Sequence, residues 1–249
     1  MSEGGQDAGK AQDVALAQVR EGRRALAAGD LAAAETALRK ALAADPGHHA
    51  ASRHLIQLLE RQKRYSDAIV EIDRLTALGH GDAALALRRG VSLASLDRLE
   101  EAEAALREVF ERDPAQPAAA AHYSALLERL DRADEASGVL MRALKARPDD
   151  EILWLRMGVL LVGMERGREA LIALRQTLKL APGSVPAITH LAAELTRQEQ
   201  PDEAYEVLRE GAKAAPEAVP VLLALGAAAF ERDPAVAADA YRGILAAQP

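Results

Sequence analysis

Apolar residues recur along this chain at intervals of three and four, and the pattern that they form repeats every 34 residues. Trp154, Met157, Gly158 and Leu161 show this spacing, which places them on one face of a helix. A second amphipathic stretch follows each first one after a short polar turn, as in EEAEAALREVFERDP from Glu100. The alternation predicts a series of helix–turn–helix pairs along almost the whole chain.

Several sets of residues mark the 34-residue period. The first residues of each second helix include one alanine of the series Ala34, Ala68, Ala102, Ala136, Ala170 and Ala204. Four residues later stands an aliphatic residue, in the series Leu38, Ile72, Leu106, Leu140, Leu174 and Leu208. A proline ends most pairs, at Pro46, Pro114, Pro148, Pro182 and Pro216, with His80 where one is missing. Small residues let two helices approach closely, and proline keeps one pair from fusing to the next.

A 34-residue helix–turn–helix unit with these markers resembles the tetratricopeptide repeat (TPR) family, and Trp154–Gly158 (WLRMG) is similar to the family's opening motif. The resemblance implies an all-α fold, a right-handed α-solenoid or superhelix of TPR helix–turn–helix repeats. Seven repeats are expected within residues 15–249, at 15–48, 49–82, 83–116, 117–150, 151–184, 185–218 and 219–249. The polar, Gly-rich segment 1–14 is expected to be a disordered N-terminal tail.

Position 6 of the repeat, counted from residue 15, can carry a positive charge in six consecutive repeats. The side chains are Arg20, His54, Arg88, His122, Arg156 and His190. In TPR proteins this position lies on the first helix and faces the concave groove. Position 13 lies two turns further along the same face and adds a second basic row, Arg61, Arg129 and Arg197. Positions 5 and 9 between the rows are mostly apolar or small, so the pattern predicts a groove with an apolar floor and basic edges.

Two interpretations of these basic rows are open. Arginine presents a planar fork suited to carboxylates, and it only donates hydrogen bonds, so the ligand would be an acidic or acceptor-rich protein segment. In the other interpretation the basic side chains pair with acids on neighbouring helices, for instance Glu60 and Glu128. The chain contains no Asn, so the family's Asn-based peptide clamps cannot be carried over whole.

The composition and the short motifs of the chain disfavour several classes of function. The net charge of −7 disfavours nucleic-acid binding. The absence of Cys excludes disulfides and thiolate catalysis and fits a cytoplasmic location. The start of the chain does not read as a secretory signal, and the longest apolar run, AVPVLLALGAAAF, is too short to insert across a membrane. No catalytic or phosphate-binding motif is present, and His48 and His49 with His54 lack metal-ligand spacing on one helix face. We therefore expect no enzyme activity, no metal and no cofactor.

The sequence thus predicts a non-enzymatic protein-binding module or scaffold that recognises an acidic or acceptor-rich protein segment in its concave groove. The alternative is an N-terminal targeting or oligomerisation module of a glycosyltransferase or sulfotransferase type of enzyme whose catalytic domain is not in this chain; such arrangements are frequent in bacteria. A third possibility is a homo-oligomer that uses the groove for another copy of itself.

The seventh repeat is the least polar, with Leu222, Leu225, Phe230, Tyr241 and Ile244 offering more apolar surface than one neighbouring repeat can cover. An uncovered apolar face of this kind usually marks an interaction site. We therefore expect a second copy of the chain or a following domain to cover it.

Overall fold

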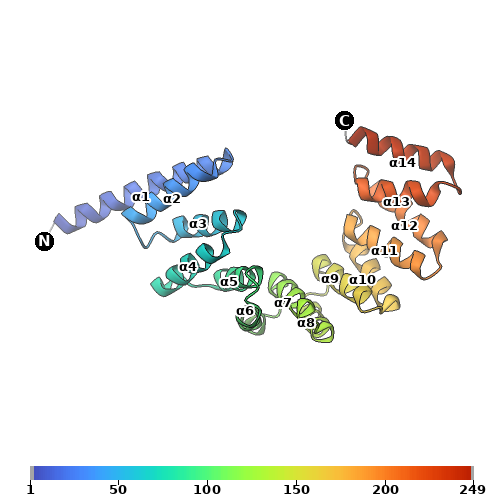
Figure 1. Cartoon of the computed structure of the whole chain (residues 1–249), viewed down its shortest axis with the longest axis horizontal. Helices are drawn as coiled ribbons and strands as arrows, with labels where there is room; N and C mark the ends of the chain where they lie inside the picture. Colours follow the sequence, from blue (N-terminus) through green and yellow to red (C-terminus); the bar gives the residue numbers. More distant parts are fainter. Residues whose placement is uncertain (1–2, 248–249) are drawn as a thin grey trace. The chain divides into compact units, whose positions relative to one another are not determined.

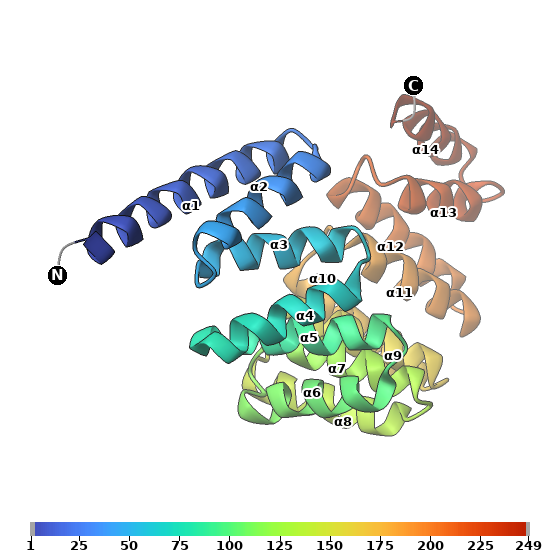
Figure 2. The same ribbon diagram turned by 60° about the vertical axis from the view of Figure 1, so that its left-hand side comes forward.

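The structure, a computed structural model, describes residues 3–247, with side chains described from residue 9 to residue 246. Within residues 3–247 it contains fourteen α-helices, one π-helical turn and no β-strand, which confirms the predicted all-α repeat architecture. The helices fall into two compact units, Met1–Arg112 and Asp113–Pro249, where the sequence predicted one continuous array. Within each unit, consecutive helices are joined by short turns into antiparallel pairs (Figures 1 and 2).

Each predicted repeat from the second to the seventh corresponds to one helix pair. The N-terminal unit holds α1 (Glu3–Ala27), α2 (Leu31–Ala44), α3 (His49–Arg61), α4 (Tyr65–Leu75), α5 (Ala83–Ser95) and α6 (Leu99–Arg112). The C-terminal unit holds α7 (Pro117–Arg129), α8 (Ala133–Ala146), α9 (Glu151–Gly163), α10 (Gly167–Leu180), α11 (Val185–Arg197), α12 (Pro201–Ala214), α13 (Val219–Ala229) and α14 (Pro234–Ala247).

The residues that mark the period form the core. The six alanines of the series are at most 3% exposed, and the aliphatic residues four positions later are at most 4% exposed. The small residues of the first helices lie at the helix crossings. A Cβ atom added to Gly90 would stand 2.7 Å from Leu106, and one added to Gly158 would stand 2.7 Å from Leu174. The two helices within each of these pairs therefore approach so closely that a Cβ atom at the glycine would clash with the opposite leucine.

The turn between the two helices of a pair uses the same backbone conformation in six repeats. One residue in each turn has a positive φ between 56° and 78°, and these residues again follow the 34-residue period: Gly29, Lys63, Asp97, Asp131, Glu165 and Glu199. In the seventh repeat, Ala237 follows Gly226 by one residue less than Ala170 follows Gly158. Helix α13 ends early there, and none of the residues between α13 and α14 has a positive φ.

The second repeat ends differently from the others because His80 stands where they have proline. The chain continues past α4 through a π-helical turn, Thr76–His80, and leaves it at Gly79, whose φ is +84°. Proline would have stopped the helix by lacking a backbone N–H. Glycine ends it instead, since glycine adopts the left-handed conformation without a steric penalty.

The structure differs from the sequence prediction at the N-terminus. Helix α1 begins at Glu3, so residues 3–14, predicted to be a disordered tail, extend the first helix; residues 1 and 2 lie outside the described part. The segment contains no proline, and adding a turn to an existing helix avoids the cost of nucleating one. Helix α1 thus runs well past the end of α2 (Figure 1).

The predicted apolar surface of the seventh repeat is only partly present. Leu222 and Leu225 are buried, at 6% and 5% exposure, and belong to the core of the C-terminal unit. Phe230 and Leu245 are 67% and 73% exposed, and Tyr241 lies at the limit of exposure at 36%. The exposed apolar surface therefore lies at the α13–α14 turn, on α14, and on α13 at Leu223, which is 56% exposed; Ile244 is half-buried.

Candidate ligand-binding face

The position-6 side chains lie on the first helices of the pairs, and two of them, Arg88 and Arg156, pair with a residue of the preceding first helix. In the N-terminal unit, Arg88 of α5 pairs with Glu60 of α3. In the C-terminal unit, Arg156 of α9 pairs with Glu128 of α7. We call this surface of the first helices the ladder face. Neighbouring first helices thus bring the cationic positions side by side within each unit, as the repeat spacing predicts.

Arg88 and Arg156 form pairs of the kind that the second interpretation expects. Each arginine bonds the glutamate that lies 28 residues earlier, on the preceding first helix. Burial raises the pKa of Glu60, and the positive charge of Arg88 opposes that rise. The guanidinium of Arg156 keeps one buried donor, Nε, without a hydrogen bond within the described part of the chain. These two arginines therefore hold adjacent helices together, and a ligand would have to compete with a glutamate for them.

Arg197 of the second row is held within its own helix. Its Nη2 and Nε donate to the two carboxylate oxygens of Glu194 at 2.7 and 2.9 Å, and Gln198 Nε2 donates to the same carboxylate at 2.7 Å. Glu194 is 2% exposed, and its bonds with Arg197 lower its pKa despite burial. Gly167 makes room for this buried carboxylate, since a Cβ there would stand 2.0 Å from Glu194 Oε1.

The N-terminal unit carries basic side chains on the ladder face that a ligand could bind without breaking an internal ion pair. Arg20 and Arg61 are exposed, and neither forms an ion pair or hydrogen bond with a side chain among the described residues. His54 is half-buried; burial first, and then the charge of nearby Arg23, lower its pKa. Arg23, exposed and likewise without a described partner, was missed by the sequence prediction. It occupies position 9 of the first repeat, and this position is apolar in the third and fifth repeats, so the repeat pattern does not indicate an arginine there.

The C-terminal unit offers fewer cationic groups on the ladder face. His122 is exposed, yet partial desolvation by its surroundings and the charge of Arg156 lower its pKa. His190 is half-buried. Arg129 is exposed but takes part in an interaction within the chain. Since Arg156 and Arg197 pair with glutamates and Arg129 also interacts within the chain, none of these three arginines is left without an internal partner.

A hollow of about 430 Å³ lies on the ladder face between α11, α12 and α13. Its lining is mostly small: Thr189, Ala192, Ala193, Thr196, Pro201, Ala204, Leu208, Ala224, Ala227, Ala228 and Arg232. Thr189 and Ala193 occupy positions 5 and 9, where the sequence predicted the floor of the groove. Arg232, at its edge, pairs with Asp202 and stands over the Tyr205 ring at 4.9 Å. In the C-terminal unit, the ladder face thus offers a ligand an apolar recess.

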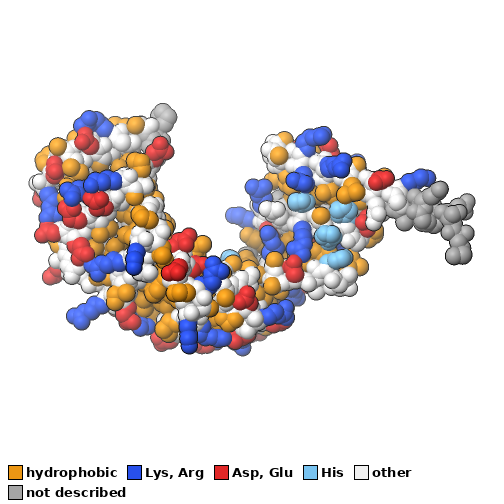
Figure 3. All heavy atoms as spheres, turned by 180° about the vertical axis from the view of Figure 1, so that it is seen from behind, with side chains coloured by type: hydrophobic (Ala, Val, Ile, Leu, Met, Phe, Trp, Pro, Cys, Tyr) orange, Lys and Arg blue, Asp and Glu red, His pale blue; other side chains and the backbone are white. Residues whose placement is uncertain are grey.

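Three histidines, His48, His49 and His80, gather at the start of α3 and the end of the turn after α4. His48 and His49 have ring centroids 6.3 Å apart, and His49 lies 5.5 Å from His80. Figure 3 shows histidines close together over the N-terminal helices, beside Lys and Arg side chains. Among the described residues, however, no three His, Asp or Glu side chains are arranged so that they could hold a metal ion. His48 has a local role, because its Nδ1 accepts a bond from Ala51 N at the start of α3.

A family model of the tetratricopeptide repeat matches residues 25–89 and 93–158, more than half of the chain. The chain belongs to the tetratricopeptide repeat family. The TPR assignment agrees with the period, the helix pairs and the small residues at the helix crossings. No curated protein sequence matches the chain. Among residues 3–247, no helix combines the length and the apolar character needed to cross a membrane.

Solved TPR structures are similar to this chain in fold. A tetratricopeptide repeat protein from Parabacteroides merdae has a TM-score of 0.67 at 13% identity, over 95% of this chain and 93% of that one. PilF of Pseudomonas aeruginosa has a TM-score of 0.64 at 18% identity, over 90% and 100%. YrrB, described as a TPR protein with an unusual peptide-binding site, has a TM-score of 0.53 at 18% identity, over 75% and 96%. At these identities the similarity concerns the fold alone.

Proposed function

We propose that this TPR protein is a non-enzymatic scaffold that binds an acidic or acceptor-rich protein segment on its ladder face. The TPR fold is that of a protein-interaction scaffold, and the repeat is generally non-catalytic. The specificity rests on one observation: Arg20, Arg23 and Arg61 are exposed, and none has a side-chain partner among the described residues. Arginines left free in this way can bind carboxylates without first breaking an internal ion pair.

The two units contribute differently to this proposal. The N-terminal unit supplies the charge, with His54 close to Arg23. The C-terminal unit supplies the recess lined by alanine and threonine between α11 and α13. Carboxylates of a ligand segment would match the chemistry of the first unit, and apolar side chains would match that of the second. Arg88, Arg156 and Arg197 support the helices that present them, since each is already paired with a glutamate.

Binding of a labelled acidic peptide tests the proposal. The probe is a synthetic peptide of alternating Glu and Leu, and its matched control carries Gln in place of Glu. The double variant Arg20→Glu, Arg23→Glu should weaken binding of the Glu peptide about tenfold or more at 0.15 M salt, because it reverses two exposed charges. Fluorescence anisotropy of the labelled peptide measures the change.

A charge-matched control separates the site from the overall charge of the protein. Lys40 and Arg168 are exposed and lie on α2 and α10, away from the ladder positions. Lys40→Glu with Arg168→Glu changes the net charge by the same amount as the test variant. If both double variants weaken binding equally, or if the Gln peptide binds as tightly as the Glu peptide, the proposed specificity is wrong.

The apolar surface of the seventh repeat favours a second contact. Phe230 and Leu245 are strongly exposed, and we propose that another copy of the chain or a following domain covers them. The enzyme-module alternative also requires a domain after Pro249, of glycosyltransferase or sulfotransferase type. The complete open reading frame tests that alternative directly.

A further inference from the structure

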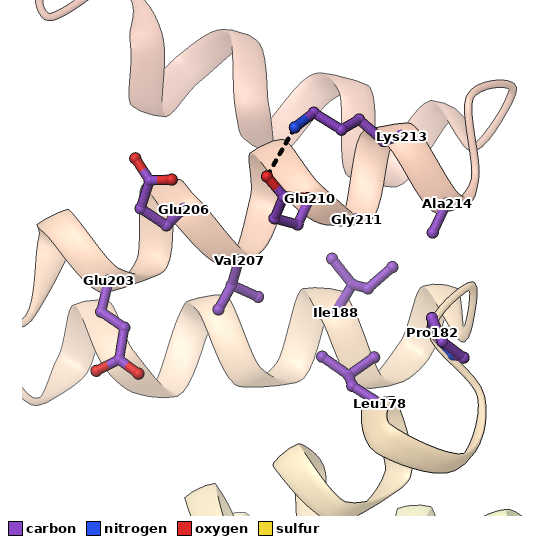
Figure 4. Close-up of a pocket in the computed structure, with 10 residues that line it drawn as sticks. All are labelled: Leu178, Pro182, Ile188, Glu203, Glu206, Val207, Glu210, Gly211, Lys213 and Ala214. Atoms are coloured by element: carbon purple, nitrogen blue, oxygen red, sulfur yellow. Dashed lines mark hydrogen bonds and ion pairs between the residues drawn. The ribbon is translucent and has the colours of Figure 1, made fainter.

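A second recess lies in the C-terminal unit, away from the ladder positions. It has a volume of about 660 Å³ and lies between α10, α11 and α12. This volume falls within the range of ligand-binding clefts in proteins. None of the nine predicted ladder residues lines it. In Figure 4, Leu178, Ile188 and Val207 point into the space between the helices and form an apolar floor. We call this recess the α10–α12 cleft.

Small residues of α12 form part of the lining of the cleft. Gly211 is buried, and a Cβ atom there would stand 2.6 Å from Cγ2 of Ile188. One turn further along α12, Ala214 offers only a methyl group to the lining. The position of Gly211 in the repeat holds Leu75 in the second repeat and Thr177 in the fifth. The sixth repeat thus has the smallest residue at this position, and glycine there lets α12 approach Ile188 of α11 closely at the edge of the cleft.

The rim of the cleft is acidic. Glu203, Glu206 and Glu210 line it from α12, and Lys213 is the one cationic residue among its lining residues, all of which are described. The lining therefore carries three negative charges against one positive charge. The glutamates stand three and four residues apart, so they share one side of α12 over about 10 Å. A row of carboxylates at this spacing matches cations placed one turn apart on a second helix.

The internal partners of these glutamates are easily replaced. Arg175 lies 2.5 Å from Glu203, Arg209 lies 2.6 Å from Glu206, and Lys213 lies 2.8 Å from Glu210. All six side chains are roughly half exposed or more. Exposed pairs of this kind contribute little to stability and exchange readily for other cations. The hydrogen bond from Lys213 lowers the pKa of Glu210.

We propose that the α10–α12 cleft binds an amphipathic helix of a partner protein, with aliphatic side chains on the apolar floor and Lys or Arg residues against the glutamate rim. The floor, the rim and the spacing of the rim residues together select this occupant. The chemistry is opposite to that of the ladder face, which favours acidic segments. The cleft therefore gives the protein a second docking surface of opposite charge preference, on the second helices of its pairs.

A synthetic helix serves as the probe. It has Leu at spacings of three and four and Lys at the other positions, and it carries a fluorescent label. Binding to the full chain is measured by anisotropy at 0.15 M salt. A matched peptide with Ala in place of Leu should bind at least about tenfold more weakly, because it lacks the aliphatic side chains that the floor would bury. Equal binding of the two peptides would contradict the proposal.

Charge reversal on the rim tests the proposed contact between the glutamates and the Lys or Arg residues of the bound helix. Glu206→Lys with Glu210→Lys should weaken binding of the Leu–Lys helix about tenfold or more. The control pair, Glu100→Lys with Glu231→Lys, changes the net charge equally at exposed positions outside the cleft and should leave binding within about threefold. Both pairs lie on the surface, so the fold should be retained. Equal weakening by both pairs would mean that the helix responds only to net charge.

The apolar floor and the identity of the occupant are tested with valine variants. Val207→Ser should weaken binding of the Leu–Lys helix, whereas Val70→Ser, at a 68% exposed valine of α4, should not. Sedimentation at several concentrations completes the test. Self-association of the wild type that Val207→Ser abolishes would show a second copy in the cleft and overturn the proposal. Arg20→Glu with Arg23→Glu should leave this binding intact, which keeps the outcome separate from that of the ladder face.

Discussion

The helix crossings make the sharpest stability prediction, because two glycines in neighbouring helices differ only in their surroundings. Gly158 is in the interior of α9, and a Cβ atom there would stand 2.7 Å from both Cγ and Cδ2 of Leu174. Gly138 is in the interior of α8, and a Cβ atom there meets nothing within 4 Å. The same substitution, Gly→Ala, therefore tests packing at one site and helix propensity alone at the other.

The expected magnitudes follow from these surroundings. Alanine favours a helix over glycine by about 0.8–1 kcal/mol, so Gly138→Ala should stabilise the protein by roughly that amount. Gly158→Ala gains the same term but adds a methyl group against Leu174, which is 0% exposed and cannot swing into solvent. Overpacking of this kind costs about 1–3 kcal/mol. We therefore expect Gly158→Ala to be less stable than Gly138→Ala by roughly 1–3 kcal/mol.

Urea unfolding followed by far-UV circular dichroism measures the difference. Thermal melts should agree, with Gly158→Ala melting several degrees below Gly138→Ala, since about 1 kcal/mol shifts Tm by roughly 2–4 °C in a chain of this size. Because repeat proteins can unfold in parts, the comparison uses two variants of the same unit. If Gly158→Ala proved as stable as Gly138→Ala, the close helix crossing at Gly158 would be refuted.

Three further predictions follow from the core, the histidines and the C-terminal repeat. Ala170→Leu should destabilise the protein by about 1–3 kcal/mol in the same urea assay, because Ala170 is fully buried at a helix crossing; unchanged stability would show that its surroundings can expand. His54 and His122 have lowered pKa values, so below about pH 6.5 the unfolded chain binds more protons than the folded one, and stability should fall as the pH drops. The double variant His54→Gln, His122→Gln should flatten this dependence between pH 7 and 5.5, and an unchanged slope would assign it to other groups. Phe230→Glu with Ile244→Glu should abolish any concentration-dependent self-association seen by light scattering, and a wild type that is monomeric at every concentration would exclude the second-copy contact.

The sequence by itself determined the architecture, because the features that define a TPR pair act locally. Alanine and glycine at fixed positions set where two helices can cross, and proline or Gly79 ends a helix through its own backbone. The aliphatic series recurs at helical spacing, so the core could be assigned before any contact was known. The position of the ladder on the first helices followed from the same period. The composition of residues 1–14 favours disorder, whereas the structure continues α1 from a packed helix back to Glu3; composition alone does not indicate such an extension.

Only the tertiary structure decided which ladder residues are available. The pairs Arg88–Glu60 and Arg156–Glu128 join residues 28 apart, and such a contact depends on how neighbouring pairs stack. The sequence contains both residues of each pair. It does not show whether the arginine binds a glutamate of this chain or a carboxylate of a ligand, because either can accept the hydrogen bonds of the same guanidinium. The availability of Arg23 and the opening of the α10–α12 cleft beside Gly211 were decided in the same way. Both depend on which side chains the adjacent helices place next to them, and periodicity along one helix does not contain that information.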